Sequence, residues 1–184
     1  MFNEILVAIL LFLPAGIANS IPVIVAKTPF LKRFNYPLDF KKTYKGIRIF
    51  GDHKTIRGLI FGIVFGILTT MLIKDYLINN SDLQYHIIMN VKEINVIIYG
   101  TLAASGALIG DAIKSFFKRR TAIKPGDSWF PFDQIDYIIG ALIFISFYMQ
   151  FTIVQYLAIF IIYFGLHLLS SYIGFLLKLK EKPI

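Results

Sequence analysis

Uncharged apolar runs divide the chain into segments that match the thickness of a lipid bilayer. The runs cover residues 5–26, 58–73, 94–110 and 137–177, and apolar residues continue beyond the charges that end the second and third. One helical crossing needs roughly 20 residues, so the last run predicts two helices that turn near Gln150. We therefore expect an all-α, polytopic integral membrane protein with five transmembrane helices in a single domain, 1–184. The expected spans are 5–26, 58–78, 94–116, 136–150 and 153–177.

The first apolar run has an alternative interpretation as a cleaved signal peptide. Small residues at Gly16 and Ala18 lie at plausible cleavage positions. However, no Lys or Arg precedes the run, and it continues without a break into a basic segment. A signal peptide normally begins with a positively charged region, so a retained helix is favoured.

Composition supports the membrane interpretation and excludes several classes of protein. Of the 184 residues, 57% are hydrophobic and 16% are charged, whereas a soluble domain has about 25% charged residues. The chain contains no cysteine, which excludes disulfides, thiolate metal sites and thiol nucleophiles. Its three histidines, His53, His86 and His167, are too few and too scattered for a histidine-based metal site.

Basic residues predict how the chain is oriented in the membrane. Segment 27–57 holds nine basic and two acidic residues, segment 114–136 holds five and three, and segment 74–93 holds two and three. Cytoplasmic connections carry an excess of Lys and Arg. We therefore expect a multi-pass protein of the cell membrane with cytoplasmic loops at 27–57 and 117–135, an outside N-terminus and a cytoplasmic C-terminus.

The first cytoplasmic loop and the helix before it contain polar residues that suit a phosphate ligand. Asn19 lies in the string Asn-Ser-Ile-Pro inside the first span, where proline frees a backbone carbonyl. Lys54, Thr55 and Arg57 lie in a cluster bracketed by glycines at the mouth of the second span. Lys and Arg form charge-assisted hydrogen bonds with phosphate. The alternatives are a kinked helix and a solvated basic loop that only anchors the topology.

The densest group of charges lies between the third and fourth spans. Asp111, Ser115 and Lys118 share one helix face, and Asp133 and Asp136 share another. Three carboxylates without thiols suit a hard cation such as Mg2+, and the neighbouring Lys118, Arg119 and Lys124 suit a polyphosphate. The alternatives are that the acids cap helices or that Asp111 pairs with Lys114 or Lys118 along its own helix.

These residues carry a family resemblance. The strings GDAIKSFFKRR and KPGDSWFPFDQID, at 110–120 and 124–136, resemble the signature of the membrane CDP-diacylglycerol synthases, which reads G-D-x-x-x-S-x-x-K-R, a Lys, a Pro and then D-x-x-D. Three features depart from it: Pro125 follows Lys124, a His-Gly-Gly step is missing, and Gln134 replaces a basic residue. With the DHKTIRG loop, the NSIP string and the chain length, these departures resemble the archaeal CDP-archaeol synthases.

The resemblance covers nearly the whole chain and implies a CTP-dependent, Mg2+-dependent transferase. It implies transfer of CMP from CTP to 2,3-bis-O-geranylgeranyl-sn-glycerol 1-phosphate, an isoprenoid ether lipid phosphate, with release of pyrophosphate. The lipid phosphate is already an anionic nucleophile, so positioning and charge neutralisation are the main requirements. We expect Asp111, Lys118, Asp133 and Asp136 to be catalytic, Asp111, Asp133 and Asp136 to hold Mg2+, and Asn19, Lys54, Thr55, Arg57, Ser115, Lys118, Arg119, Lys124 and Gln134 to bind the nucleotide.

The expected partners are CTP, the ether lipid phosphate and membrane lipids, with no nucleic acid and no particular oligomeric state predicted. Alternatives stay open at this point. Among enzymes they are a CDP-diacylglycerol synthase that acts on phosphatidate and a CTP-dependent lipid kinase. Outside enzymes, the alternative is an anion transporter or lipid-binding protein. A transporter usually places polar residues across the full depth of the bilayer and in repeated halves. Here they gather at one membrane face, which favours the enzyme.

Overall fold

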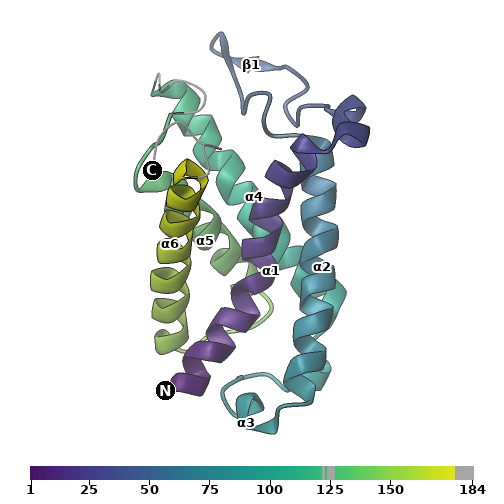
Figure 1. Cartoon of the computed structure of the whole chain (residues 1–184), viewed down its shortest axis with the longest axis vertical. Coiled ribbons are helices and arrows are strands. Elements are labelled where there is room, and N and C mark those ends of the chain that lie inside the picture. The colour runs from purple at the N-terminus through teal and green to yellow at the C-terminus, as the bar shows by residue number, and fades with distance from the viewer. Residues whose placement is uncertain (122, 124–126, 177–184) are drawn as a thin grey trace.

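The structure is a computed structural model that describes residues 1–121, 123 and 127–176. Five main helices form a bundle (Figure 1). They are joined by short elements, and the element order along the chain is α1 (Phe2–Lys27), η1 (Pro29–Phe34), β1 (Thr43–Tyr44), β2 (Ile47–Arg48), α2 (Ile56–Ile78), α3 (Ser81–Gln84), η2 (Val91–Glu93), α4 (Val96–Arg120), α5 (Phe132–Ser146) and α6 (Ile153–Leu176).

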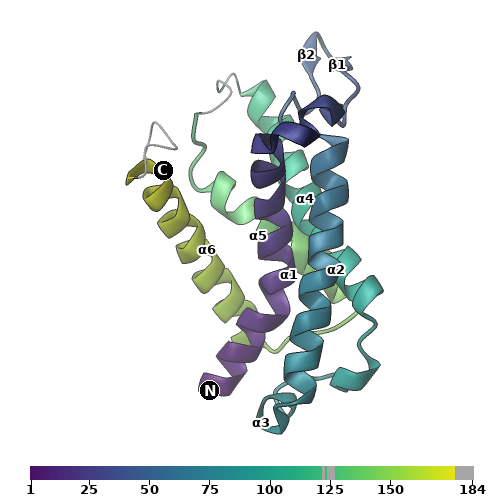
Figure 2. The same ribbon diagram turned by 45° about the vertical axis from the view of Figure 1, so that its right-hand side comes forward.

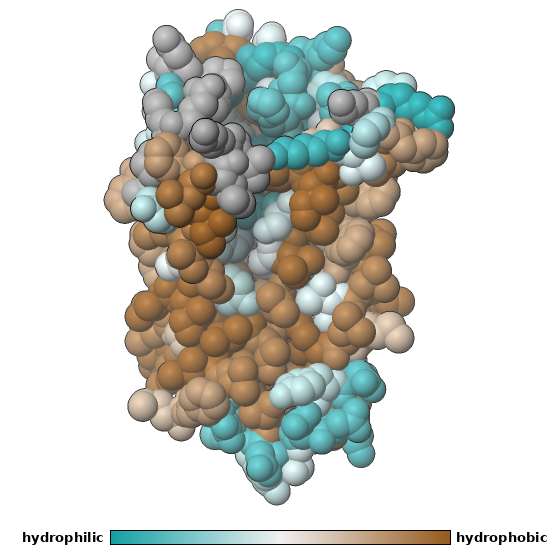
Figure 3. Space-filling model, in the orientation of Figure 1, coloured by the Kyte–Doolittle hydropathy of each residue, from teal (hydrophilic) through white to brown (hydrophobic). Residues whose placement is uncertain are grey.

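The protein is a mostly helical, multi-pass membrane protein. Among the described residues, α1, α2, α4 and α6 are long and apolar enough to cross a bilayer. On the face shown in Figure 3, an apolar belt covers the middle of the molecule, and hydrophilic surfaces lie at both ends. Since the backbone groups of a helix bond within the helix, helices of this length can cross a lipid bilayer.

The fourth expected span differs from the prediction in position and length. The sequence predicts a helix over 136–150, whereas α5 covers Phe132–Ser146. Its 15 residues extend only about 22 Å at a rise of 1.5 Å each, which is less than the roughly 30 Å of a hydrocarbon core. The helix begins four residues earlier than expected. Hydropathy starts the span at 136, whereas the first turn of α5 also includes the polar Asp133 and Gln134.

α1 is the central helix, and it contacts α2, α4, α5 and α6. Three buried tyrosines tie the bundle together through their hydroxyl groups. Tyr99 of α4 donates to the carbonyl of Leu11 at 2.7 Å. Tyr163 of α6 donates to Ile9 at 2.7 Å, and Tyr137 of α5 donates to the carbonyl of Tyr163 at 3.0 Å. Figure 2 shows that α6 lies close to α1 near the N-terminus and leans away from it toward the other end.

Glycines let α4 and α5 pack with their backbones in contact. A Cβ atom added at Gly110 would lie 2.3 Å from the carbonyl oxygen of Asp136, and one added at Gly140 would lie 2.3 Å from that of Gly106. Small residues allow this close approach between membrane helices. The crossing sets the first turns of α5 beside the segment of α4 around Gly110.

The connection between α1 and α2 is folded around one carboxylate, that of Asp39. This carboxylate accepts backbone N–H groups of Lys41, Phe50 and Gly51 at 3.0–3.1 Å, and the Arg48 guanidinium donates two hydrogen bonds at 2.7 and 3.2 Å. Burial raises the pKa of Asp39, but the bonds from Arg48 and the backbone outweigh it and hold that pKa well below its usual range. These hydrogen bonds give the connection between α1 and α2 a defined fold.

The charged end of the molecule is formed by residues 28–55 and the C-terminal ends of α4 and α6 (Figures 1 and 2). The N-terminus and the connection from α2 to α4 lie at the opposite end. The antiparallel strands β1 and β2 form a hairpin, which packs on α4 through Arg120. The Arg120 guanidinium lies 5.2 Å from the centroid of the Tyr44 ring and 3.3 Å from that of the Phe116 ring. Thr55 then begins α2, its hydroxyl oxygen accepting the Gly58 N–H at 3.1 Å.

Candidate active site

Three carboxylates from two helices share one lysine. The Lys114 Nζ lies 3.2 Å from Asp111 Oδ1, 2.6 Å from Asp133 Oδ1 and 3.1 Å from Asp136 Oδ2. Asp111 and Lys114 belong to α4, while Asp133 and Asp136 belong to the first turns of α5. The predicted meeting of the three acids is therefore present in the structure.

Two further lysines complete this group of charges. Lys118 Nζ donates to both oxygens of Asp133 at 3.2 and 2.9 Å. Lys54, which precedes α2, forms an ion pair with Asp111. We call the six side chains together the lysine–aspartate cluster: Lys54, Asp111, Lys114, Lys118, Asp133 and Asp136. Its three negative and three positive charges balance each other.

Helical spacing and close packing explain why these residues meet. Asp111, Lys114 and Lys118 follow one another at three and four residues, which places them on one face of α4. The close approach at Gly110 brings the start of α5 to the same level. In addition, the N–H of Trp129 donates to Asp133 Oδ2 at 2.6 Å, which holds that carboxylate from the incoming chain.

The alternative roles considered for the acids are partly observed. Asp111 does pair with Lys114 along its own helix. However, the residue that caps the N-terminus of α5 is Pro131, and no side-chain hydrogen bond caps it. Asp133 bonds a residue that precedes the helix, and Asp136 accepts the N–H of Tyr137 at 2.6 Å. Helix capping therefore does not account for the convergence of the three acids.

Because the cluster is buried, any charge in it that lacks a partner is energetically costly. The side chain of Asp136 is only 6% exposed, and that of Lys114 is 14% exposed. Asp136 Oδ2 is buried and accepts no hydrogen bond from the described residues, although the Lys114 ammonium is near it. Unpaired charges in such surroundings are costly, so the cluster depends on its mutual ion pairs.

The donor chemistry of the cluster fits Mg2+. Carboxylate oxygens are the ligands that this ion prefers, the three acids reach a single shared cation, and Asp136 Oδ2 has unused acceptor capacity. Within residues 1–121, 123 and 127–176, no group of three or more His, Cys, Asp or Glu side chains is arranged as a metal site as it stands. The ammonium shared by the carboxylates is that of Lys114.

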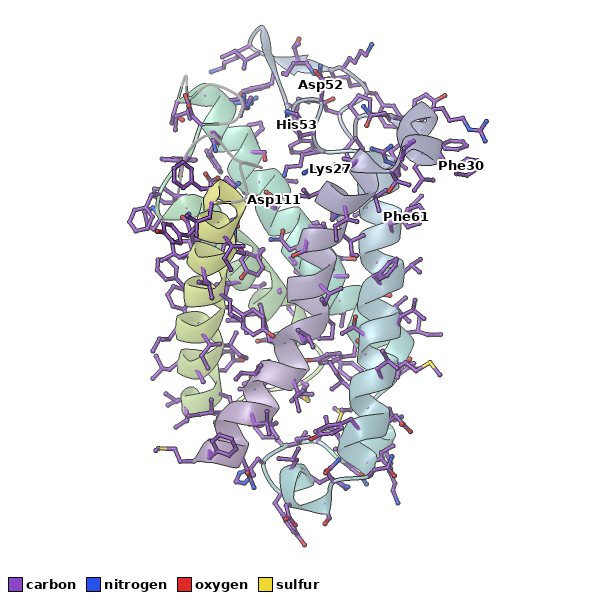
Figure 4. All side chains as sticks on the ribbon, in the orientation of Figure 1. Lys27, Phe30, Asp52, His53, Phe61 and Asp111 are labelled. Atoms are coloured by element: carbon purple, nitrogen blue, oxygen red, sulfur yellow. The ribbon has the colours of Figure 1, made fainter. Side chains whose placement is uncertain are left out.

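A cavity of about 320 Å³ lies beside the cluster. Asp111 and Lys54 of the cluster line it, together with Asn19 and Thr55. Lys54, Asn19 and Thr55 are among the residues predicted to bind the nucleotide. Figure 4 shows the side chains of Lys27, His53 and Asp111 in this region, where the end of α1, the folded connection and α4 meet. Lys27 and His53 also line the cavity, although the sequence does not mark them as site residues.

Arg57 lies apart from the cluster. Its guanidinium donates to the carbonyl of Leu31 and to Asn35 Oδ1, the latter at 3.3 Å. It lines a second cavity of about 350 Å³, which shares His53 and Thr55 with the first. Arg57 Nε is buried and has no hydrogen-bond partner among the described residues.

Among the described residues, no hydrogen bond or ion pair joins the side chains of Ser115, Arg119 or Gln134 to the cluster. Ser115 and Gln134 are buried, and Gln134 Oε1 has no hydrogen-bond partner. Arg119 Nε is buried without a partner as well. Lys124 lies outside the described residues. Conversely, the sequence indicates Lys114 only as a helical partner of Asp111. The acids of α5 come close to Lys114 only in the folded structure.

Comparisons with known proteins agree on one family. The family model "CarS-like: CDP-archaeol synthase" matches residues 1–184. A CDP-archaeol synthase of Saccharolobus islandicus is 35% identical over 182 residues, covering 98% of this chain and 96% of that protein. One of Pyrobaculum aerophilum is 33% identical over 181 residues, covering 98% and 99%.

A solved structure is also similar. It is described as an intramembrane enzyme for archaeal membrane lipids biosynthesis. It superposes with a TM-score of 0.70 at 31% sequence identity, and the match covers 89% of this chain and 92% of that one.

Proposed function

Because this chain belongs to the CDP-archaeol synthase family, we propose that the lysine–aspartate cluster is where it transfers CMP from CTP to an archaeal ether lipid phosphate. The lipid substrate is 2,3-bis-O-geranylgeranyl-sn-glycerol 1-phosphate, and pyrophosphate is released. The observation that carries this assignment is the convergence of three carboxylates and three lysines beside a cavity. A transporter would be expected to spread its polar residues over the full depth of the bilayer, whereas these charges gather at one level.

The lysines of the cluster provide the binding site for the phosphates. Lys54 and Lys118 join the cluster from different elements, one from the folded connection and one from α4. Preorganised positive groups stabilise the charge of a transferring phosphoryl group and of its leaving group. The lipid phosphate supplies the attacking oxygen. The chain therefore needs to align the two substrates rather than to remove a proton.

The cavity beside Asp111 suits the nucleoside part of CTP. Asn19 contributes an amide that both donates and accepts hydrogen bonds. The hydroxyl oxygen of Thr55 accepts the N–H of Gly58, which leaves its O–H free to donate. His53 lines both this cavity and the neighbouring one that Arg57 lines, so the two together extend the surface available to the nucleotide.

Asp111, Asp133 and Asp136 are the residues that would hold Mg2+. When bound there, the ion would neutralise charge on the CTP phosphates and on the departing pyrophosphate. Two observations support this part of the proposal: the donor chemistry of the three acids and the unused acceptor capacity of Asp136 Oδ2. Lys54 and Lys118 would keep Asp111 and Asp133 in place while the substrates bind.

We further propose five membrane passages, with α5 and the residues that follow it as the fourth. The charged end then faces the cytoplasm, because segment 27–57 holds nine basic residues against two acidic ones. The N-terminus lies outside and the C-terminus inside. This orientation lets CTP enter from the cytoplasm, while the isoprenoid tails of the lipid remain beside the apolar belt.

The direct test uses purified protein in detergent with CTP labelled in its α-phosphate. One reaction contains Mg2+ and the geranylgeranylated glycerol phosphate, a second contains Mg2+ and phosphatidate, and a third contains the ether lipid phosphate and EDTA. We expect labelled CDP-lipid, with release of unlabelled pyrophosphate, in the first reaction alone. Product from phosphatidate at an equal rate would refute the lipid assignment, and full activity in EDTA would refute the metal assignment.

A further inference from the structure

Lys114 has a position that the transfer reaction by itself does not explain. Its ammonium lies within 3.2 Å of an oxygen of each of the three acids. Protein ligands bind Mg2+ at about 2.0–2.1 Å. A metal ion held by all three acids would therefore need the space that the Lys114 ammonium fills. The two cations exclude each other.

We propose that Lys114 is a built-in counterion that holds the three carboxylates together while the metal is absent, and that it gives up this place when a divalent cation binds. The inference rests on the proposed metal site. It assigns to Lys114 a positioning role that differs from the roles of Lys54 and Lys118, because those two lysines each contact a single carboxylate.

The pairing pattern shows why Lys114 is the lysine that can leave. Without it, Asp111 keeps the ion pair with Lys54, and Asp133 keeps the pair with Lys118. Asp136 has no second cationic partner among the described residues, and its Oδ2 accepts no hydrogen bond. The departure of Lys114 thus opens a place that is lined by three acids and needs a new cation. The flexible four-carbon stem of lysine permits the movement.

The exchange also changes the charge that the nucleotide meets. With Lys114 in place, the three carboxylates and three ammonium groups cancel. A divalent cation in place of the Lys114 ammonium makes the cluster net positive, and the displaced ammonium adds one more positive charge nearby. Such a site attracts a triphosphate. Metal and CTP therefore favour each other's binding, whereas metal alone must compete with Lys114.

The test compares metal binding in the wild type and in Lys114→Met, without CTP and without lipid substrate. Methionine keeps most of the length of the side chain and removes the charge. The matched control is Lys74→Met, because Lys74 donates to the carbonyls of Lys92 and Ile94 at the opposite end of α2. Calorimetric titration with Mg2+ alone gives the affinity, and thermal unfolding with Mg2+ or with EDTA gives the stability.

For Lys114→Met we expect Mg2+ to bind at least tenfold more tightly than to the wild type. We also expect a lower melting temperature in EDTA that Mg2+ restores. Lys74→Met should show wild-type affinity and a loss of stability that Mg2+ does not repair. If Lys114→Met is recovered only from Mg2+-containing buffers, the proposal is supported. Equal or weaker Mg2+ affinity refutes it, as does failure of both Lys114→Met and Lys114→Gln to fold in Mg2+.

A wild-type titration in the presence of CTP separates this proposal from the metal site itself. If the wild type binds Mg2+ with CTP and the Lys114 variant gains no affinity without it, only the counterion role is wrong. If neither protein binds Mg2+ under any condition, the metal assignment is wrong, and the role of Lys114 falls with it.

Discussion

Replacing Asp136 with Asn tests the site most directly. Asp136 is the most buried of the three acids, and Lys114 is its single cationic partner among the described residues. Asn has nearly the same size, but it puts a neutral amide where a carboxylate would bind the metal. It also removes one of the three carboxylate charges around Lys114, while Asp111 and Asp133 keep that ammonium paired. The substitution thus changes the ligand set with little change in packing.

The expected loss of activity is large and the expected loss of stability is small. A metal ion supplies several kcal/mol of charge stabilisation, and each 1.36 kcal/mol changes the rate tenfold. Losing about 3–4 kcal/mol of that stabilisation lowers CMP transfer about 100- to 1000-fold. The folded protein loses one buried polar interaction, which costs about 1–3 kcal/mol. Raising the Mg2+ concentration should recover part of the activity, since one of three ligands is weakened.

The assay is the initial rate of CDP-lipid formation over a range of Mg2+ concentrations, combined with thermal unfolding in detergent. Asp75→Asn is the matched control, because Asp75 is exposed and lies near the opposite end of α2. It should leave both the rate and the melting temperature unchanged. A rate for Asp136→Asn within a factor of two of the wild type, with normal Mg2+ dependence, would show that this carboxylate has no part in the reaction.

Three further predictions concern other parts of the charged end. Lys54→Ala would remove a charge-assisted hydrogen bond to phosphate, which is worth about 1.5–3 kcal/mol. The KM for CTP should therefore rise about tenfold or more, with membrane insertion unchanged. A normal KM would show that Lys54 only pairs with Asp111. Folding depresses the pKa of Asp39. The contribution of Asp39 to stability is therefore complete above about pH 4 and decreases as the pH falls below that value. Limited proteolysis of the β1–β2 hairpin should be faster at pH 3 than at pH 6, and equal rates would contradict this. Because the chain has no cysteine, single cysteines introduced at position 81 or 44 can report its orientation. A membrane-impermeant thiol reagent applied to cells should label Ser81→Cys and leave Tyr44→Cys unlabelled. The reverse pattern would invert the proposed topology.

The apolar runs contained most of the information needed to predict the fold. Spans over 5–26, 58–78 and 94–116 correspond to α1, α2 and α4, because long uncharged runs permit few alternatives in a bilayer. The exact start of α5 was less predictable. The helix begins at Phe132 and has Asp133 in its first turn, whereas hydropathy starts the span at 136. Lysines of α4 pair with Asp133 and Asp136, and such tertiary ion pairs cannot be read from hydropathy.

The candidate site shows the same division between local and tertiary information. The three acids could be selected from their spacing, since helical periodicity places residues on faces without any knowledge of the fold. The shared partner Lys114 could not be selected, because two of its three ion pairs join two helices that cross at glycines. Likewise, nothing local distinguishes Arg57, which bonds a carbonyl of η1, from Lys54, which reaches Asp111.

The depth of the cluster follows from where α5 crosses α4 and bears on how the two proposed substrates can meet. Asp111 precedes the end of α4 at Arg120 by nine residues, which corresponds to about 13 Å along the helix axis. The acids of α5 lie at the same level because Gly110 packs against the backbone of Asp136. The cluster therefore lies below the charged end of the molecule and not at its tip. Under the proposed function, this depth lets a lipid phosphate reach the cluster while its tails stay in the bilayer, and CTP approaches through the cavity that Asp111 and Lys54 line.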